Sequence, residues 1–256
     1  MAQMRIGLQM YTLRTETAND FTGVLRKVAA LGYEGVEFAG YGGLKPDELA
    51  KLLHELNLVA IGSHVSIEQL MNKLDEEIEM NVAIGSKYVI CPYLEEQRRN
   101  SEQAIAETLA VFKEASRRFA DKGIQFCYHN HDFEFTEKIG NSLLFDNIVG
   151  DTTAEQIAIE LDVCWVKYAG YDPVAYIQQY AGRIPLIHLK DLRITEDGKP
   201  LTVELGNGEV NLHAVIDAAG AANVNWMIVE QDVCQNPPLE SVSTSMKWLR
   251  EHYLNK

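Results

Sequence analysis

The sequence has 256 residues, of which 46% are hydrophobic and 23% are charged, a composition typical of globular proteins and not of disordered or fibrous ones. Its 37 acidic and 23 basic residues give a formal net charge of −14, which argues against nucleic acid because clustered Lys and Arg bind phosphate backbones. No apolar run approaches the ~18–20 residues of a membrane span. We therefore expect neither a nucleic acid nor a membrane as partner.

Two features indicate the compartment. The four cysteines include no CxxC pair, so we expect free thiols in a reducing environment. Residues 1–14 lack the apolar core of a secretory signal peptide and enter a strand-like pattern directly. The sequence therefore predicts a cytoplasmic protein.

Short apolar runs rich in Val, Ile and aromatic residues recur along the chain, and each is typical of a buried strand. In chain order, the eight runs are Arg5–Tyr11, Gly35–Ala39, Leu58–His64, Lys87–Pro92, Ile124–His129, Ile157–Asp162, Ile184–Lys190 and Trp226–Gln231. Most of the stretches between them place apolar residues at helical spacing, and the longest helical patterns cover Glu102–Ala120 and Leu239–Tyr253.

Eight strands that alternate with helices over about 250 residues predict a (β/α)8 TIM barrel. A doubly wound open sheet is the main alternative, but its first strand would normally lead into a Gly-rich phosphate loop. Here the first strand ends in Gln9–Thr12 without such a loop, and the short G-x-G at Gly206–Gly208 follows a polar loop. No linker or change of composition divides the chain, so we expect one domain over residues 1–256.

Charged or imidazole side chains stand at or just past the ends of most predicted strands. In a barrel these positions face the active-site mouth, and a buried charge costs several kcal/mol unless it is paired or metal-bound. The residues at these positions are Glu37, His64, His129, His131, Asp162, His188, Lys190 and Glu230.

Asp162, His188 and Glu230 end three successive strands and are therefore expected side by side. Two carboxylates and an imidazole suit a divalent cation, with Mn²⁺ the first expectation and Mg²⁺, Co²⁺ or Zn²⁺ as alternatives. Each residue also has a structural interpretation, with Asp162 as a helix cap, His188 as a hydrogen-bonded core residue and Glu230 as a salt-bridge partner of Lys190.

The segment Tyr128–Glu134 is the densest polar cluster in the sequence. His129 and His131 are two residues apart and point to the same side of a strand. One of them is expected to bind the metal, and the other to orient a substrate hydroxyl or to act as acid or base. A hydrogen-bonded loop that plugs the barrel mouth is the alternative. Lys190 is expected either to pair with a carboxylate or to stabilise an enolate oxygen.

Five further residues are candidates for substrate binding. His64 ends a strand, Trp165 could stack on a sugar ring, and Glu37 could instead be a buried pairing residue. Glu204 and Asn207 lie in the loop after the seventh strand and are expected to close over the ligand.

Taken together, these residues resemble the xylose-isomerase-like TIM barrels, a family described broadly as sugar phosphate isomerases/epimerases. Nearly the whole chain contributes to the resemblance, and the segments Leu161–Asp162, Arg183–Asp191 and Val229–Glu230 also resemble inosose dehydratases. The segments that carry the family resemblance are Gly32–Glu37, Tyr128–His131, Leu161–Asp162 followed by Ala169–Pro173, Arg183–Asp191, and Val229–Glu230.

The resemblance implies a metal held by Glu, Asp, His and Glu on strands 5 to 8, and the last three map onto Asp162, His188 and Glu230. His129 stands where the epimerases have the first Glu, unless Glu134 folds back to supply the carboxylate. Epimerases of this type use two glutamates on opposite faces of the substrate. With only Glu230 at a matching position, isomerisation or elimination from a keto-sugar becomes the simpler expectation, as in inosose dehydratases and keto-glycoside lyases.

We therefore predict a divalent-metal-dependent sugar isomerase or epimerase that acts on a ketose or keto-sugar through an enediolate. Glu230 or His131 would remove the α-proton, with Glu134 as a further catalytic candidate, and Lys190 would stabilise the enediolate. The alternatives are a keto-sugar dehydratase or lyase, and a sugar-binding barrel without catalysis. An endonuclease IV-like phosphodiesterase would need more metal ligands and a basic face. The expected partner is a small carbohydrate, and a homo-oligomer is left open.

Overall fold

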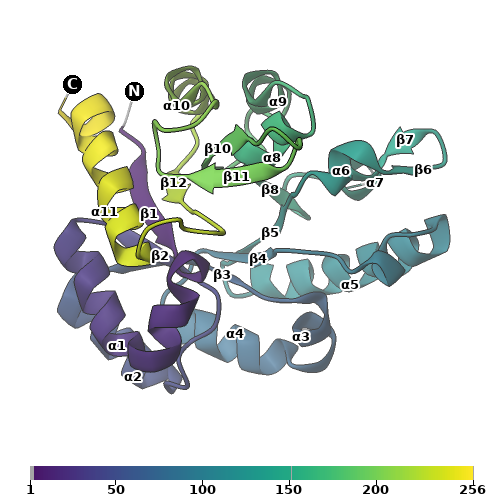
Figure 1. The fold of residues 1–256 in the computed structure, drawn as a ribbon. Helices are drawn as coiled ribbons and strands as arrows, with labels where there is room; N and C mark the ends of the chain where they lie inside the picture. The colour runs from purple at the N-terminus through teal and green to yellow at the C-terminus, as the bar shows by residue number, and fades with distance from the viewer. Residues whose placement is uncertain (1–2, 151, 256) are drawn as a thin grey trace.

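The computed structural model describes residues 3–150 and 152–255. Eight parallel strands close into a barrel in the order β1-β12-β9-β8-β5-β4-β3-β2 (Figure 1). Each of the eight predicted runs contains one of these strands, so the predicted (β/α)8 barrel is confirmed. The barrel strands are β1 (Arg5–Gln9), β2 (Gly35–Phe38), β3 (Val59–His64), β4 (Tyr88–Cys91), β5 (Gln125–His129), β8 (Ala158–Asp162), β9 (Leu186–Leu189) and β12 (Trp226–Val229).

Helices surround the barrel and cover the outer face of its strands (Figure 1). The pattern that predicts a helix over Glu102–Ala120 matches α5. The helices are α1 (Arg14–Leu31), α2 (Pro46–Leu56), α3 (Ile67–Asn72), α4 (Leu74–Ala83), α5 (Glu102–Ala120), α6 (Phe133–Thr136), α7 (Leu144–Gly150), α8 (Val163–Tyr168), α9 (Pro173–Gln179), α10 (Leu212–Ala221) and α11 (Pro238–Leu249).

Two short antiparallel hairpins lie outside the barrel sheet. One pairs β6 (Lys138–Ile139) with β7 (Ser142–Leu143), and the other pairs β10 (Asp191–Ile194) with β11 (Pro200–Val203). The second hairpin follows β9 directly, so the chain leaves the barrel mouth there before it returns to α10.

The alternation of side chains along a strand separates the barrel interior from the helical layer. On β8, Ile159 and Leu161 point outward into the core between strands and helices. Ala158 belongs instead to a separate apolar cluster inside the barrel, and Glu160 and Asp162 follow it on the same side of the strand. The same strand therefore contributes to an apolar outer core and to a polar site.

The apolar interior cluster lies toward the amino ends of the strands, as at Leu186 and Trp226, the first residues of β9 and β12. At two interior positions there is no space for a Cβ atom, so only glycine fits. A Cβ on Gly7 would collide with the Ile61 side chain, and one on Gly35 would lie 2.8 Å from the same side chain. The full cluster consists of Ile61, Ile90, Cys127, Ala158, Leu186, Trp226 and Ile228.

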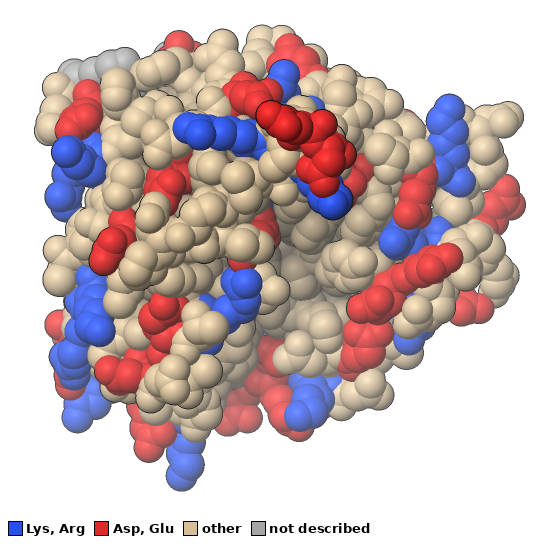
Figure 2. All heavy atoms as spheres, viewed as in Figure 1, with Lys and Arg blue, Asp and Glu red and all other residues tan. Residues whose placement is uncertain are grey.

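On the face drawn in Figure 2, basic side chains lie among acidic ones and gather in no broad patch. No helix among residues 3–150 and 152–255 has the length and apolar character to cross a membrane. The single domain over residues 1–256 stays a prediction, and four of its residues, 1, 2, 151 and 256, lie outside the described part.

Candidate metal centre and active site

A cavity of about 640 Å³ opens at the carboxyl ends of the strands. Glu230 and the three histidines His64, His129 and His131 line it from the strand ends. Residues from the β2–α2 loop, α3 and α4 line it as well, and among them Glu77 accepts hydrogen bonds from Tyr41 and Gln69 at 2.8 Å each. Polar groups from both the strand ends and these helices therefore line the cavity, as a polyhydroxylated ligand requires.

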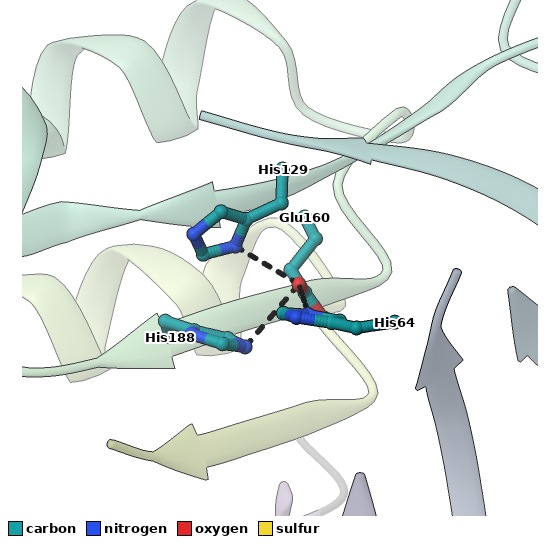
Figure 3. Close-up of side chains that lie close together, drawn as sticks. All are labelled: His64, His129, Glu160 and His188. Carbon is teal, nitrogen blue, oxygen red and sulfur yellow. Dashed lines mark hydrogen bonds and ion pairs between the residues drawn. The ribbon is translucent and has the colours of Figure 1, made fainter. Parts of the chain in front are cut away.

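A lower layer of the site is formed by two buried glutamates and three histidines, each from a different strand. Glu160 Oε2 lies 3.0 Å from both His64 Nε2 and His129 Nδ1, and these rings converge on it in Figure 3. It also lies 3.2 Å from His188 Nε2. Glu37 Oε2 lies 2.8 Å from His188 Nε2 and 3.0 Å from His64 Nε2. Both glutamates have no exposed surface, so these imidazoles supply much of their solvation.

An upper layer lies closer to the mouth and is organised around one ammonium group. Lys190 Nζ lies 2.8 Å from Asp162 Oδ2, 2.6 Å from Glu230 Oε2 and 2.9 Å from Asp232 Oδ2. His188 Nδ1 lies 2.9 Å from Glu230 Oε2. Three carboxylates meet one ammonium group and one imidazole nitrogen here, so negative charge predominates, and a divalent cation would help to balance it.

Local structure fixes the orientation of Asp162. Its Oδ1 accepts hydrogen bonds from the backbone N–H groups of Cys164 and Trp165 and so caps α8, as one interpretation of the sequence anticipated. Its Oδ2 is left to face the upper layer. Asn130 bonds both the N–H and the carbonyl of Asp162, which ties the ends of β5 and β8 together. Oδ1 of Asp162 thus caps α8, and Oδ2 of the same carboxylate is the candidate metal ligand.

The charges of the two layers follow from these contacts. Burial disfavours the charged form of His64, but Glu37 and Glu160 outweigh burial and raise its pKa to about 9. Burial opposes the charge on Lys190 too, and its three carboxylates keep its pKa above the ordinary value. Burial raises the pKa of Glu230, but Lys190 and His188 outweigh it and hold the pKa below its usual range. Glu230 is therefore ionised at neutral pH.

His131 and Glu134 are three residues apart in the chain but face different surroundings. His131 lines the cavity, with its ring stacked on Phe133 at 5.7 Å, and burial together with Lys190 lowers its pKa to about 3. Glu134 is turned away: its oxygens accept hydrogen bonds from the Tyr128 hydroxyl at 2.6 Å and the His131 N–H at 2.8 Å. Burial raises the pKa of Glu134 to about 8. His129, not Glu134, thus extends from strand 5 into the cluster.

The predicted substrate-binding residues fall into three groups. His64 lines the cavity, whereas Glu37 lies beneath it in the lower layer. Trp165 stands beside the upper layer, with its ring 5.3 Å from Lys190 Nζ. Glu204 bonds the side chains of Asn236 and Ser241 on the α11 side. Neither Glu204 nor Asn207 lines the cavity.

Asp191 accounts for the placement of that loop. Its carboxylate accepts hydrogen bonds from four backbone N–H groups, among them those of Gly206 and Gly208. A Cβ on Gly208 would collide with this carboxylate. The loop therefore folds around Asp191, and the closure of Glu204 and Asn207 over a ligand stays a prediction.

Sequence reasoning missed Glu160, Asp232 and Gln9, whose Nε2 donates to Glu37 Oε2 at 2.6 Å. Glu160 stands two residues before Asp162 and therefore points to the same side of β8, which was a usable signal. A rule that inspects only the ends of strands overlooks a charged residue within one.

The donor set of the upper layer fits a divalent cation. One ligand atom each from His129, Asp162, His188 and Glu230 lies within 4.8 Å of the others, and all four residues are buried. Two carboxylates and two imidazoles are the mixed O/N set that Mn²⁺, Co²⁺ and Zn²⁺ accept. The lower layer offers a second combination, His64, His129, Glu160 and His188, and the two sets share two imidazoles.

Residues 25–252 match the family described as Xylose isomerase-like TIM barrel. The chain belongs to this family. The match covers the strands that carry both layers of the site.

The curated relatives are distant. An inosose dehydratase from Clostridium botulinum is 22% identical over 274 aligned positions, which cover 91% of this chain and 90% of the relative. One from Geobacillus thermodenitrificans is 25% identical over 152 positions, or 52% of this chain, which thus spans about half (49%) of that relative's length.

Two solved structures illustrate the shared fold. A sugar phosphate isomerase/epimerase from Parabacteroides distasonis has a TM-score of 0.82 at 22% identity, covering 100% of this chain and 96% of its own. The IOLI protein with a bound zinc atom has a TM-score of 0.77 at 14% identity, covering 98% of this chain and 99% of its own. At these identities the likeness is one of fold.

Proposed function

We propose that this protein is a divalent-metal-dependent isomerase or epimerase of a ketose or keto-sugar, acting by removal of a proton next to a carbonyl. The observation that carries the proposal is the upper layer, where Asp162, Glu230, two imidazoles and Lys190 meet at the wall of a polar cavity. The proposed metal ligands are His129, Asp162, His188 and Glu230, with Mn²⁺ first and Mg²⁺, Co²⁺ or Zn²⁺ as alternatives. The bound ion would act as a Lewis acid toward the oxygens of a hydroxy-carbonyl group.

Two residues are suited to take the α-proton. Glu230 is ionised, because Lys190 and His188 lower its pKa against the effect of burial. His131 is neutral at physiological pH, and its Nδ1 is buried without a hydrogen-bond partner. Both bases are therefore unprotonated before reaction, as proton abstraction requires.

Lys190 is proposed to stabilise the enediolate that remains after proton removal. Its ammonium group is fully buried, and burial strengthens its interaction with a developing oxyanion. In an isomerisation the proton returns to the neighbouring carbon, so that the carbonyl and hydroxyl exchange places. His64 and Trp165 are proposed to position the sugar from the cavity wall and from the side of Lys190.

A keto-sugar dehydratase is the second candidate, and the position of Glu134 favours it. Symmetrical epimerisation needs two bases on opposite faces of the carbon, but Glu134 is engaged by Tyr128 and the His131 backbone. A one-sided site can remove the α-proton and release a β-hydroxyl as water. The similarity to inosose dehydratases supports the dehydratase candidate.

The test is to strip the protein with EDTA, restore Mn²⁺, and incubate it in D₂O with a panel of ketoses, inososes and 3-keto-glycosides. We expect metal-dependent exchange of an α-proton, detected by NMR. An isomeric sugar as product identifies an isomerase or epimerase, and an unsaturated product identifies the dehydratase. A protein that neither binds Mn²⁺ nor exchanges a proton of any panel member would contradict both candidates.

A further inference from the structure

Glu160 lies one layer below the proposed metal ligands and contacts two of them. Its Oε2 is 3.0 Å from Nδ1 of His129 and 3.2 Å from Nε2 of His188 (Figure 3). The residue has no exposed surface and does not line the cavity, and on β8 it stands two residues before Asp162, further from the mouth.

The opposite nitrogens of the same two rings face the upper layer. His129 Nε2 lies 3.8 Å from Asp162 Oδ2, and His188 Nδ1 lies 2.9 Å from Glu230 Oε2. Each imidazole therefore spans both layers, with one nitrogen at Glu160 and the other at the proposed ligand carboxylates. A neutral imidazole has one N–H and one lone pair, so the partner of one nitrogen decides the role of the other.

We infer that Glu160 is a positioning residue that accepts the N–H bond of His129 and shares that of His188 with Glu37, and thereby helps to present the lone pairs of their opposite nitrogens to the metal. This inference rests on the proposed function, in which His129, Asp162, His188 and Glu230 hold the ion. Carboxylates that orient metal-binding histidines in this way are a general feature of metal sites. Here one carboxylate oxygen serves two ligands on different strands.

Neighbouring residues restrain Glu160 itself. His64 Nε2 lies 3.0 Å from Glu160 Oε2, and its ring stacks on that of His188 with centroids 5.6 Å apart. Glu37 Oε2 shares the lower nitrogen of His188 at 2.8 Å. Glu160 is the carboxylate that contacts both His129 and His188. Its loss removes the acceptor of the His129 N–H and leaves Glu37 as the acceptor of the His188 N–H.

Two arguments place the ion above Glu160 and not beside it. The lower layer pairs its two carboxylates with three imidazoles, whereas the upper layer has three carboxylates around one ammonium group and the second nitrogen of His188. The upper layer also lies on the cavity wall through Glu230, where substrate oxygens can reach an ion. A metal that takes part in the reaction therefore belongs to the upper layer.

Glu160→Gln tests the inference, because the amide keeps the shape but replaces a carboxylate oxygen with an N–H₂ group. We expect the dissociation constant for Mn²⁺ to rise ~10–100-fold. We also expect pulsed EPR of bound Mn²⁺ to show fewer coordinated imidazole nitrogens than the two of the wild-type protein. Ile159→Val is the control, since this neighbour on β8 packs in the outer core and should alter stability without altering Mn²⁺ affinity.

An unchanged Mn²⁺ affinity and an unchanged imidazole signal in Glu160→Gln would overturn the inference. If that variant does not fold, Glu160→Asp replaces it, with the same expected direction because the shorter carboxylate no longer spans both rings. Wild-type Mn²⁺ binding and proton exchange are measured first. Their absence contradicts the proposed function and this inference together, whereas their presence with an unaffected Glu160 variant contradicts the inference alone.

Discussion

The two ends of the barrel interior are built from the same strands and differ in almost every physical property. Toward the amino ends, Ala158, Leu186 and Ile228 belong to a buried apolar cluster. Toward the carboxyl ends, the same strands or the residues just beyond them place Asp162, His188 and Glu230, which are buried and charged or paired. Apolar burial stabilises the fold, whereas buried charges cost several kcal/mol before pairing. The contrast indicates that the buried charged residues at the carboxyl ends of the strands are retained for function.

The largest expected effect on activity comes from a substitution in the upper layer. Asp162→Asn should lower kcat/KM by at least ~10³-fold, because it removes a proposed ligand and several kcal/mol of transition-state stabilisation. Asp172→Asn is a matched control, since Asp172 also caps a helix, α9, but lies outside the cavity. Equal losses of activity in the two variants would show that only helix capping matters.

The apolar cluster at the amino ends of the strands should respond in the opposite way. Ile228→Ala leaves a cavity in the apolar interior and should reduce the free energy of unfolding by about 2–5 kcal/mol. Chemical denaturation measures this loss, while calorimetry measures Mn²⁺ binding to the folded variant. We expect Mn²⁺ affinity close to wild type, and a large loss of affinity would remove the distinction between the two ends.

Glu134 sharpens the comparison because it is an acid near the carboxyl ends of the strands that forms no ion pair with a described residue. Burial raises its pKa to about 8, so the folded state holds a proton that the unfolded state has released above pH ~4.5. Stability should therefore fall as pH rises from about 4.5 to 8, by roughly 1 kcal/mol per pH unit, and level off above. Glu134→Gln should remove this part of the profile in denaturant titrations, and an identical slope in both proteins would refute it.

The smallest expected effect concerns Trp165, beside the upper layer. Its ring lies 5.3 Å from Lys190 Nζ, and such a contact contributes ~0.5–1 kcal/mol. Trp165→Leu should thus change kcat/KM about 2–5-fold once a substrate is found. A loss as large as that of Asp162→Asn would assign the indole a more direct role.

The sequence predicted the barrel well because each strand carries its own local signal. Hydrophobic periodicity and strand length require only neighbouring residues, and all eight predicted runs contain barrel strands. The strand-end rule also identified His129, His188 and Lys190, which the structure brings together. Their mutual distances could not be predicted, since they depend on how the barrel closes.

The residues that escaped prediction depend on tertiary contacts. Glu160 is within a strand, and its role becomes visible only when His64 and His129 from other strands reach it. The position of Glu204 is decided by the loop that folds around Asp191. The direction of Glu134 follows from the turn at α6, which returns its carboxylate to the hydroxyl of Tyr128. No periodic pattern encodes these arrangements.

The central claim is that a divalent ion binds in the upper layer. Anomalous diffraction from crystals soaked in Mn²⁺ tests it most directly. We predict one strong peak at ligand distance, roughly 2.0–2.2 Å, from side-chain atoms of Asp162, His188 and Glu230. A peak coordinated by Glu160 in the lower layer, or no peak in either layer, would contradict the account.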